Sequence, residues 1–219
     1  GETRAVASDF LDSVPETAVT VDAVAHTSNF RPADEDPVLV TFSGVNIITN
    51  SGGVQVLGEA TAQAADVVDN PTIIAVFRDP AGAIIGGTTS YQGFIPVGST
   101  VGVEVQTSLE LPAGTTAELY ADSFSYSFED DTDGAEVEVL ESGFSAFDSY
   151  GTPQGTWAAI VSNPNPGVAA TYVSVIATFR DAAGAVVAVD EQSITTMAPG
   201  SQSAAASDYV YDFPASAVR

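Results

Sequence analysis

One nine-residue segment occurs twice in this chain, 102 positions apart and almost unchanged. It reads Phe-Arg-Asp-Pro-Ala-Gly-Ala-Ile-Ile over residues 77–85 and Phe-Arg-Asp-Ala-Ala-Gly-Ala-Val-Val over residues 179–187. The register continues without a gap, since Gly98 falls on Gly200. An internal repeat of long period outranks other signals of organisation in a sequence. It predicts a fold that contains two copies of one structural unit.

The hydrophobic pattern predicts β-structure in both copies. Apolar and polar residues alternate with a period of two along most of the chain, and convincing helical spacing is nearly absent. The runs are rich in Val, Ile, Thr and aromatic residues, which favour strands. Gly, Pro and Asn residues separate them at intervals of roughly 8–12 residues, a spacing typical of sandwiches and barrels. The sequence therefore predicts an all-β protein.

The repeated residues themselves are those that a tight hairpin needs. Gly82 and Gly184 can take the positive φ of a hairpin turn. Asp79 and Asp181 precede them, and an Asp side chain at such a position accepts hydrogen bonds from turn amides. We interpret these four as structural turn residues, with no role in chemistry.

The copies and their flanks predict the domain boundaries. The first unit spans residues 37–130 and contains an additional segment, 105–121, which we interpret as an extra hairpin around Pro112. A short acidic hinge follows at 131–134, and the second unit spans residues 135–219. Residues 1–36 belong to neither unit and form an N-terminal extension. Function is expected where the copies differ.

The extension is mostly apolar and must pack against something. Its first part has the spacing of a short amphipathic helix, and residues 17–24 alternate like a strand. Two alternatives are open: the extension covers the first unit of its own chain, or it donates a strand to a neighbouring subunit. The residues expected to make the subunit contact in the second case are Val6, Phe10, Leu11, Val19, Val21 and Val24.

The repeats resemble a family of small Ig-like domains named for an F-x-L-Y-D motif. The second copy matches best, with one strand over residues 157–163, a second over 175–181, a turn, a third over 183–187 and a Pro-Gly turn at 199–200. The Phe-Arg-Asp ending departs from the motif's own aromatic-Asp ending. The resemblance implies two tandem Ig-like β-sandwich domains, exposed on a surface and non-enzymatic, as in secreted or membrane-anchored archaeal and bacterial proteins.

The charge of the chain is very one-sided. It has 29 Asp and Glu residues against 5 Arg and no Lys, which gives a formal net charge of −24. One interpretation is an acidic patch for a basic partner or for divalent cations. The other, which we favour because the acids are scattered, is adaptation to high salt as in extremely halophilic archaea. Nucleic acid is not an expected partner, since five scattered Arg residues cannot neutralise a phosphate backbone.

The sequence offers little for catalysis. It contains no Cys and one His, His26, so it lacks the residues for a zinc site or a nucleophile triad. The acids Glu129, Asp131 and Asp133 have the first-half spacing of a calcium loop, but Leu140 stands where the twelfth-position Glu would be. These acids form either a structural calcium site or a solvated hinge, and no other cofactor is expected. We predict that the protein is not an enzyme.

Together these observations predict a structural subunit of an extracellular assembly of a halophile. We expect a surface filament that polymerises with copies of itself, by strand exchange of the extension. The alternatives are a monomeric adhesion or solute-binding module on the cell surface, and a structural protein of a virus of halophiles. The expected location is extracellular, on a cell or virion surface. The sequence contains no run of 18 apolar residues, so it predicts no transmembrane segment.

Overall fold

A computed structural model of the protein describes residues 25, 39–50, 53–63, 67–122, 137–149 and 151–210. Strands make up the regular structure of these residues, and none of them is helical. The prediction of an all-β chain is therefore confirmed.

Thirteen strands are formed by the described residues. In chain order they are β1 (Leu39–Asn50), β2 (Gly53–Gln63), β3 (Val68–Asp69), β4 (Thr72–Arg78), β5 (Ile84–Tyr91), β6 (Phe94–Ile95), β7 (Val101–Thr107), β8 (Thr116–Asp122), β9 (Glu138–Ser149), β10 (Thr152–Ser162), β11 (Ala170–Arg180), β12 (Val186–Met197) and β13 (Gln202–Val210).

Strands β1–β8 form a first unit, which we call lobe 1. It has two three-stranded antiparallel sheets, in the orders β1-β2-β7 and β5-β4-β8, and a short pair, β3-β6. Alternate residues of a strand point to the same face. Val56 of β2, Phe77 of β4 and Val103 of β7 point between the sheets and are fully buried. They belong to one hydrophobic cluster, core 1.

Strands β9–β13 form lobe 2. Its three-stranded sheet has the order β13-β10-β9, and the hairpin β11-β12 lies over that sheet. Trp157 and Val161 of β10 pack with Phe179 of β11 and Met197 of β12 in a second cluster, core 2. The indole Nε1–H of Trp157 donates a hydrogen bond of 2.7 Å to Asp190, which satisfies the polar end of a buried ring.

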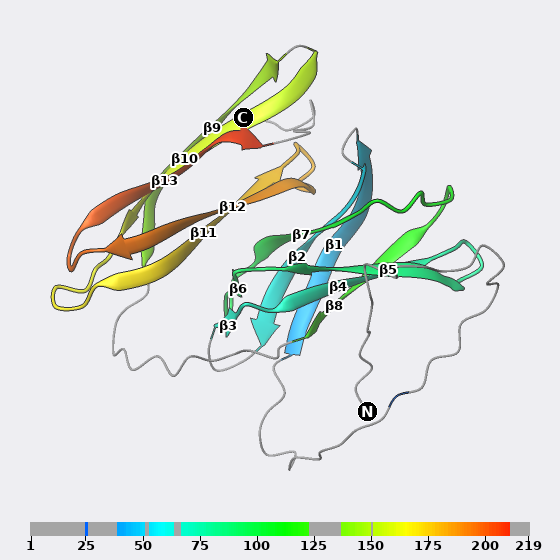
Figure 1. Ribbon diagram of the computed structural model, residues 1–219, viewed down its shortest axis with the longest axis horizontal. Coiled ribbons are helices and arrows are strands. Elements are labelled where there is room, and N and C mark those ends of the chain that lie inside the picture. Colours follow the sequence, from blue (N-terminus) through cyan, green and yellow to red (C-terminus); the bar gives the residue numbers. More distant parts are fainter. Residues whose placement is uncertain are drawn as a thin grey trace.

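The two lobes stack as four successive β-layers (Figure 1). The order is β5-β4-β8, then β1-β2-β7, then β11-β12, then β9-β10-β13. Hairpin β11-β12 is therefore covered on both faces, by core 2 on one side and by lobe 1 on the other. Contacts between the inner layers include a hydrogen bond of 2.8 Å from the Gly102 amide to Thr178 Oγ1 and an ion pair of 2.5 Å between Arg180 and Glu59.

The repeated segment forms the same turn in both lobes. Asp79 Oδ1 accepts hydrogen bonds from the amides two and four residues later, both at 2.9 Å. Asp181 Oδ1 accepts the equivalent bonds at 2.8 and 3.0 Å. Gly82 and Gly184 have φ angles of +87° and +86°, in the region that favours glycine. The near-identity of the two segments thus corresponds to near-identity of two hairpins.

The prediction of an extra hairpin over 105–121 is wrong. Residues 105–107 belong to β7, which pairs with β2, whereas β8 pairs with β4 in the opposite sheet. Between the two strands the chain turns at Pro112, whose carbonyl accepts a hydrogen bond from the Thr115 amide at 3.2 Å. The segment therefore crosses between sheets and adds an edge strand, β8, to the second one.

Candidate functional site

The strand pairing shows that both lobes follow one plan. Strands β9, β10 and β13 form the same sheet in lobe 2 as β1, β2 and β7 in lobe 1. Hairpin β11-β12 corresponds to β4-β5, and the register shifts after Phe77 in one and after Phe179 in the other. Strand β8 has no counterpart among the described strands of lobe 2. The candidate site is the side of β11 that faces away from β12, which we call the β11 edge.

Strand β8 shows what a strand at this position does. It pairs with β4 along its whole length, from Arg78 opposite Thr116 to Thr72 opposite Asp122. Its inward residue Leu119 is 8% exposed and belongs to core 1. Ala117 and Ala121, two positions away on either side, pack against the same core. In lobe 1, β8 therefore covers one side of core 1, between the two sheets.

The matching alanines of β4 and β11 differ in exposure. Ala75 lies in the middle of β4, opposite Leu119 of β8, and is fully buried. Ala177, 102 positions later on β11, packs against core 2 but is only half-buried. The two residues have the same chemistry and the same place in the repeat. The difference is therefore explained by β8, which covers one and has no described counterpart over the other.

One residue on the inner face of β9 is also exposed, although Phe144 of the same strand packs against core 2. Val139 lies opposite Val161, a fully buried residue of core 2, and cross-strand partners lie on the same face of a sheet. Val139 is nevertheless 58% exposed. On β1, the matching strand of lobe 1, Phe42 and Ile47 pack against core 1, to which β8 also contributes. A strand added at the β11 edge would correspondingly lie over β9.

The sequence of β11 does not protect its edge. Exposed edge strands usually carry charges, prolines or bulges that prevent pairing with another chain. In β11, Ala170–Arg180, the terminal Arg180 is the only charged residue, and there is no proline. Another outer strand of lobe 2, β9, carries Glu138, Glu141 and Asp148. The β11 edge therefore combines incomplete burial with a sequence that permits strand addition.

The arginine of the repeated segment has a different partner in each lobe. Arg78 Nε lies 3.0 Å from Glu118 Oε1 of β8. The hydrogen bond between them raises the pKa of Arg78 and lowers the pKa of Glu118. Arg180 instead pairs with Glu59, across the lobe interface. In lobe 2, where no β8 counterpart is described, the same arginine connects lobe 2 to lobe 1.

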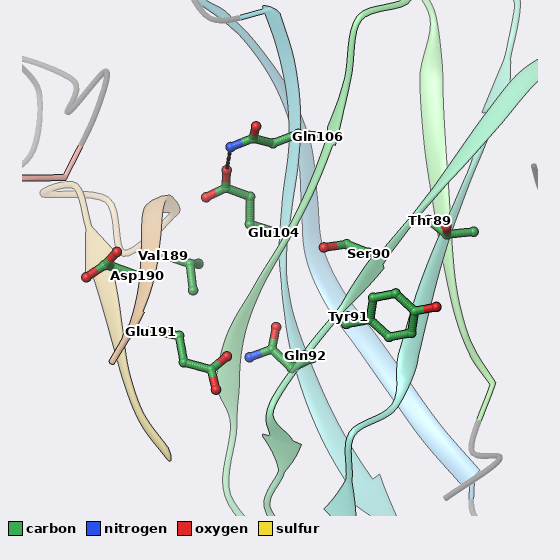
Figure 2. Close-up of a pocket in the computed structure, with 9 residues that line it drawn as sticks. All are labelled: Thr89, Ser90, Tyr91, Gln92, Glu104, Gln106, Val189, Asp190 and Glu191. Atoms are coloured by element: carbon green, nitrogen blue, oxygen red, sulfur yellow. Dashed lines mark hydrogen bonds between the residues drawn. The ribbon is translucent and has the colours of Figure 1, made fainter. Parts of the chain in front are cut away.

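A cavity of about 330 Å³ lies between the lobes. Figure 2 shows Glu104 of β7 on one side and Asp190 and Glu191 of β12 on the other. Asp190 accepts the hydrogen bond from Trp157, and Glu191 accepts one of 3.2 Å from the amide of Gly93. Within the described ranges, no group of three or more His, Cys, Asp or Glu side chains is placed to hold a metal ion. We interpret the cavity as part of the lobe interface.

Glu104 of β7 is an acid of this interface whose pKa is shifted. Burial raises the pKa of its carboxyl, although hydrogen bonds from Gln106 at 2.6 Å, from Gln55 at 2.9 Å and from the backbone of Val189 oppose the shift. A carboxyl with a raised folded pKa binds more protons in the folded state than in the unfolded state. Its contribution to stability therefore falls as the pH rises from the ordinary pKa through the folded pKa.

We accordingly expect Glu104→Gln to raise the unfolding temperature at neutral pH, with little effect at a pH below the ordinary carboxyl pKa. Thermal unfolding measured across this pH range tests the expectation. Glu118→Gln is the matched control and should lower stability at neutral pH, because the pKa of Glu118 is lowered. A Glu104→Gln variant that is less stable at neutral pH would contradict this account of the interface.

Close packing of the lobes predicts a second effect, at Gly102. A Cβ added there would lie 2.6 Å from Thr178 Oγ1 and 2.8 Å from Val189 Cγ2, both in lobe 2. We expect Gly102→Ala to lower the free energy of unfolding by about 1–3 kcal/mol, as overpacking does. The control is Gly143→Ala on β9, where an added Cβ meets nothing within 4 Å. Equal denaturation midpoints for the two variants would show that the lobes are not packed in this way.

Many residues predicted from sequence lie outside the described residues. These are the proposed contact residues Val6, Phe10, Leu11, Val19, Val21 and Val24, the acids Glu129, Asp131 and Asp133, and His26. The turn residues Asp79, Gly82, Asp181 and Gly184 lie at the two hairpin turns, and Asp181 directly follows Arg180, the last residue of β11. Sequence reasoning did not identify Ala177, Val139 or Leu119. The sequence did distinguish this region, because the segment 105–121 that leads into β8 was predicted as an addition to the first unit.

Comparison of the chain with protein-family profiles, with curated proteins and with solved structures finds no match. In the part of the chain that the structure describes, no helix is long and apolar enough to cross a membrane.

Proposed function

We propose that this chain is a non-catalytic structural subunit of an extracellular assembly of a halophile, and that its subunits polymerise by strand exchange. In this proposal each lobe is an Ig-like sandwich, and the extension of residues 1–36 supplies the exchanged strand. The assembly is a surface filament, or the surface of a virion that infects such an organism.

The observation that carries the proposal is the difference between the two lobes at β8. Lobe 1 contains the strand that completes its second sheet, and the corresponding edge of lobe 2 has no described partner strand. A chain that repeats one unit, with a described partner strand at this edge in only one copy, offers a site for a strand from elsewhere. Strand addition at an open edge gives affinity through main-chain hydrogen bonds and specificity through alternate side chains.

The composition supports the proposed habitat. A net charge of −24 without a single Lys produces strong self-repulsion in dilute buffer, which molar salt screens. Acids at the surface keep such a protein hydrated and soluble in these conditions. The charge is spread over the chain, so it favours general adaptation to salt over one binding patch.

Electron microscopy of the purified protein at molar salt, together with sedimentation over a range of concentrations, tests this function. We expect elongated assemblies whose mean mass increases with protein concentration. A single species of constant monomeric mass would overturn the proposal, and would favour an adhesion or solute-binding module.

A further inference from the structure

We propose that residues 17–24 of a second copy form a strand beside β11, where the described residues place none, antiparallel to β11 and with Val21 opposite Ala177. This inference rests on the proposed function, and it assigns the acceptor site, the donor segment and their register. Strand β8 serves as the template, because the repeat places β4 and β11 in equivalent positions.

The template defines which side chains a donor strand can carry. The inward residues of β8 are Ala117, Leu119 and Ala121, so one medium-sized side chain is flanked by two small ones. Residues 17–24 read Thr-Ala-Val-Thr-Val-Asp-Ala-Val. With Val21 at the central position, Val19 and Ala23 take the flanking ones. All three inward side chains are then apolar and small enough for a closely packed layer.

Other segments outside the described residues fit this template less well. Residues 124–128 read Phe-Ser-Tyr-Ser-Phe, so their inward face would present either three aromatic rings or two serines. Overfilling a core is destabilising, and so is burying unpaired hydroxyls. Residues 211–219 contain Pro214, which cannot donate to a strand ladder.

The register follows from the pairing in lobe 1. Leu119 lies opposite Ala75, and Ala121 lies opposite Ile73. Adding the repeat distance of 102 gives Ala177 and Val175 as the equivalent positions of β11. Val21 therefore lies opposite Ala177, and Ala23 opposite Val175.

The length of the extension permits a donor from another copy. The extension leads into β1 of lobe 1, whereas the β11 edge belongs to lobe 2. Residues 25–38 separate the donor segment from β1 and can span at most about 50 Å when extended. Such a linker can carry the donor strand out of its own subunit. A contact between unlike surfaces is heterologous, and it produces an open chain of subunits when the rotation between them does not close a ring.

Disulfide trapping tests the assignment directly, because the natural chain contains no cysteine. A tagged Val21→Cys variant is mixed before assembly with an untagged Ala177→Cys variant, at molar salt under mild oxidation. We expect a disulfide-linked heterodimer. Its yield should exceed that from random collision by on the order of 100-fold, because adjacent positions in a bound strand have millimolar effective concentrations.

Two matched variants keep this test specific. Ala75→Cys replaces Ala177→Cys as the acceptor at the equivalent position of β4, where β8 already occupies the edge. Asp22→Cys replaces Val21→Cys as the donor, one residue along and on the other face of the strand. Neither control pair should exceed the yield from random collision. Circular dichroism establishes that each variant is folded.

Each contrary outcome has a distinct meaning. An intrachain disulfide in the Val21→Cys/Ala177→Cys double variant, without dimers, would show that the extension folds onto its own chain and would overturn the inference. So would equal yields with Ala177→Cys and Ala75→Cys. If the wild-type protein assembles and removal of the extension abolishes assembly, but no heterodimer forms, strand exchange stands and this acceptor is wrong. A wild-type protein that never assembles would remove both this inference and the proposed function.

Discussion

Deletion of residues 1–25 is expected to convert the assembled protein into soluble monomers at molar salt. The deletion removes the donor strand but leaves both lobes intact, because β1 begins at Leu39. The effect should be close to all-or-none, since the subunits of a strand-exchange polymer are held by the main-chain hydrogen bonds of that strand. Sedimentation velocity and electron microscopy measure the result.

Deletion of residues 1–14 provides the control. It removes the part with helical spacing and retains residues 17–24, so assemblies should persist. If assemblies survive the longer deletion, subunits are not joined by strand exchange of this extension. If both deletions abolish assembly, the segment with helical spacing is required, and the assignment of the donor to residues 17–24 is wrong.

Low salt is expected to destabilise the protein strongly. The Debye length is about 10 Å at 0.1 M salt and about 3 Å at 1 M, so repulsion among the excess acids is screened only at the higher concentration. We expect the unfolding temperature to rise by about 10 °C between these conditions, which corresponds to roughly 3 kcal/mol for a domain of this size. Thermal unfolding followed by circular dichroism measures the shift.

Sucrose at the same osmolality as the salt separates screening from general stabilisation by excluded solutes. Sucrose strengthens burial without screening charge, so it should recover only part of the shift. An unfolding temperature that does not change with salt would contradict the assignment to a high-salt habitat. That result would not bear on the proposed strand exchange at the β11 edge.

Local chemistry made part of this fold predictable from sequence. The repeated Asp and Gly residues specify a hairpin turn within a few residues, and the alternation of apolar residues specifies strands. The described residues form these elements where the repeat indicates, at β4-β5 and at β11-β12. Each of these features depends on neighbours in sequence, so a single chain contains the necessary information.

Strand partners were not predictable in the same way. β7 and β8 follow one another and both alternate, so a hairpin over 105–121 was the simplest interpretation. Their actual partners are β2 and β4, and this choice depends on how two sheets close around core 1. Alternation indicates that one face of a strand is buried and carries no information about which strand lies beside it.

The lobe interface was also not predictable from the sequence. Thr178 and Glu104 stand at polar positions of alternating strands, where exposure to solvent is the usual expectation. The structure instead places hairpin β11-β12 between two layers, so these residues meet across the interface. The sequence did indicate that function should be sought where the copies differ, and β8 is such a place.

A density map of the assembled protein at molar salt tests the central claim most directly, namely that lobe 2 is completed by a strand from another subunit. We predict a strand beside β11, antiparallel to it and continuous with β1 of the neighbouring subunit. A β11 edge that faces solvent in the assembly, or that pairs with a segment of its own chain, would contradict the claim.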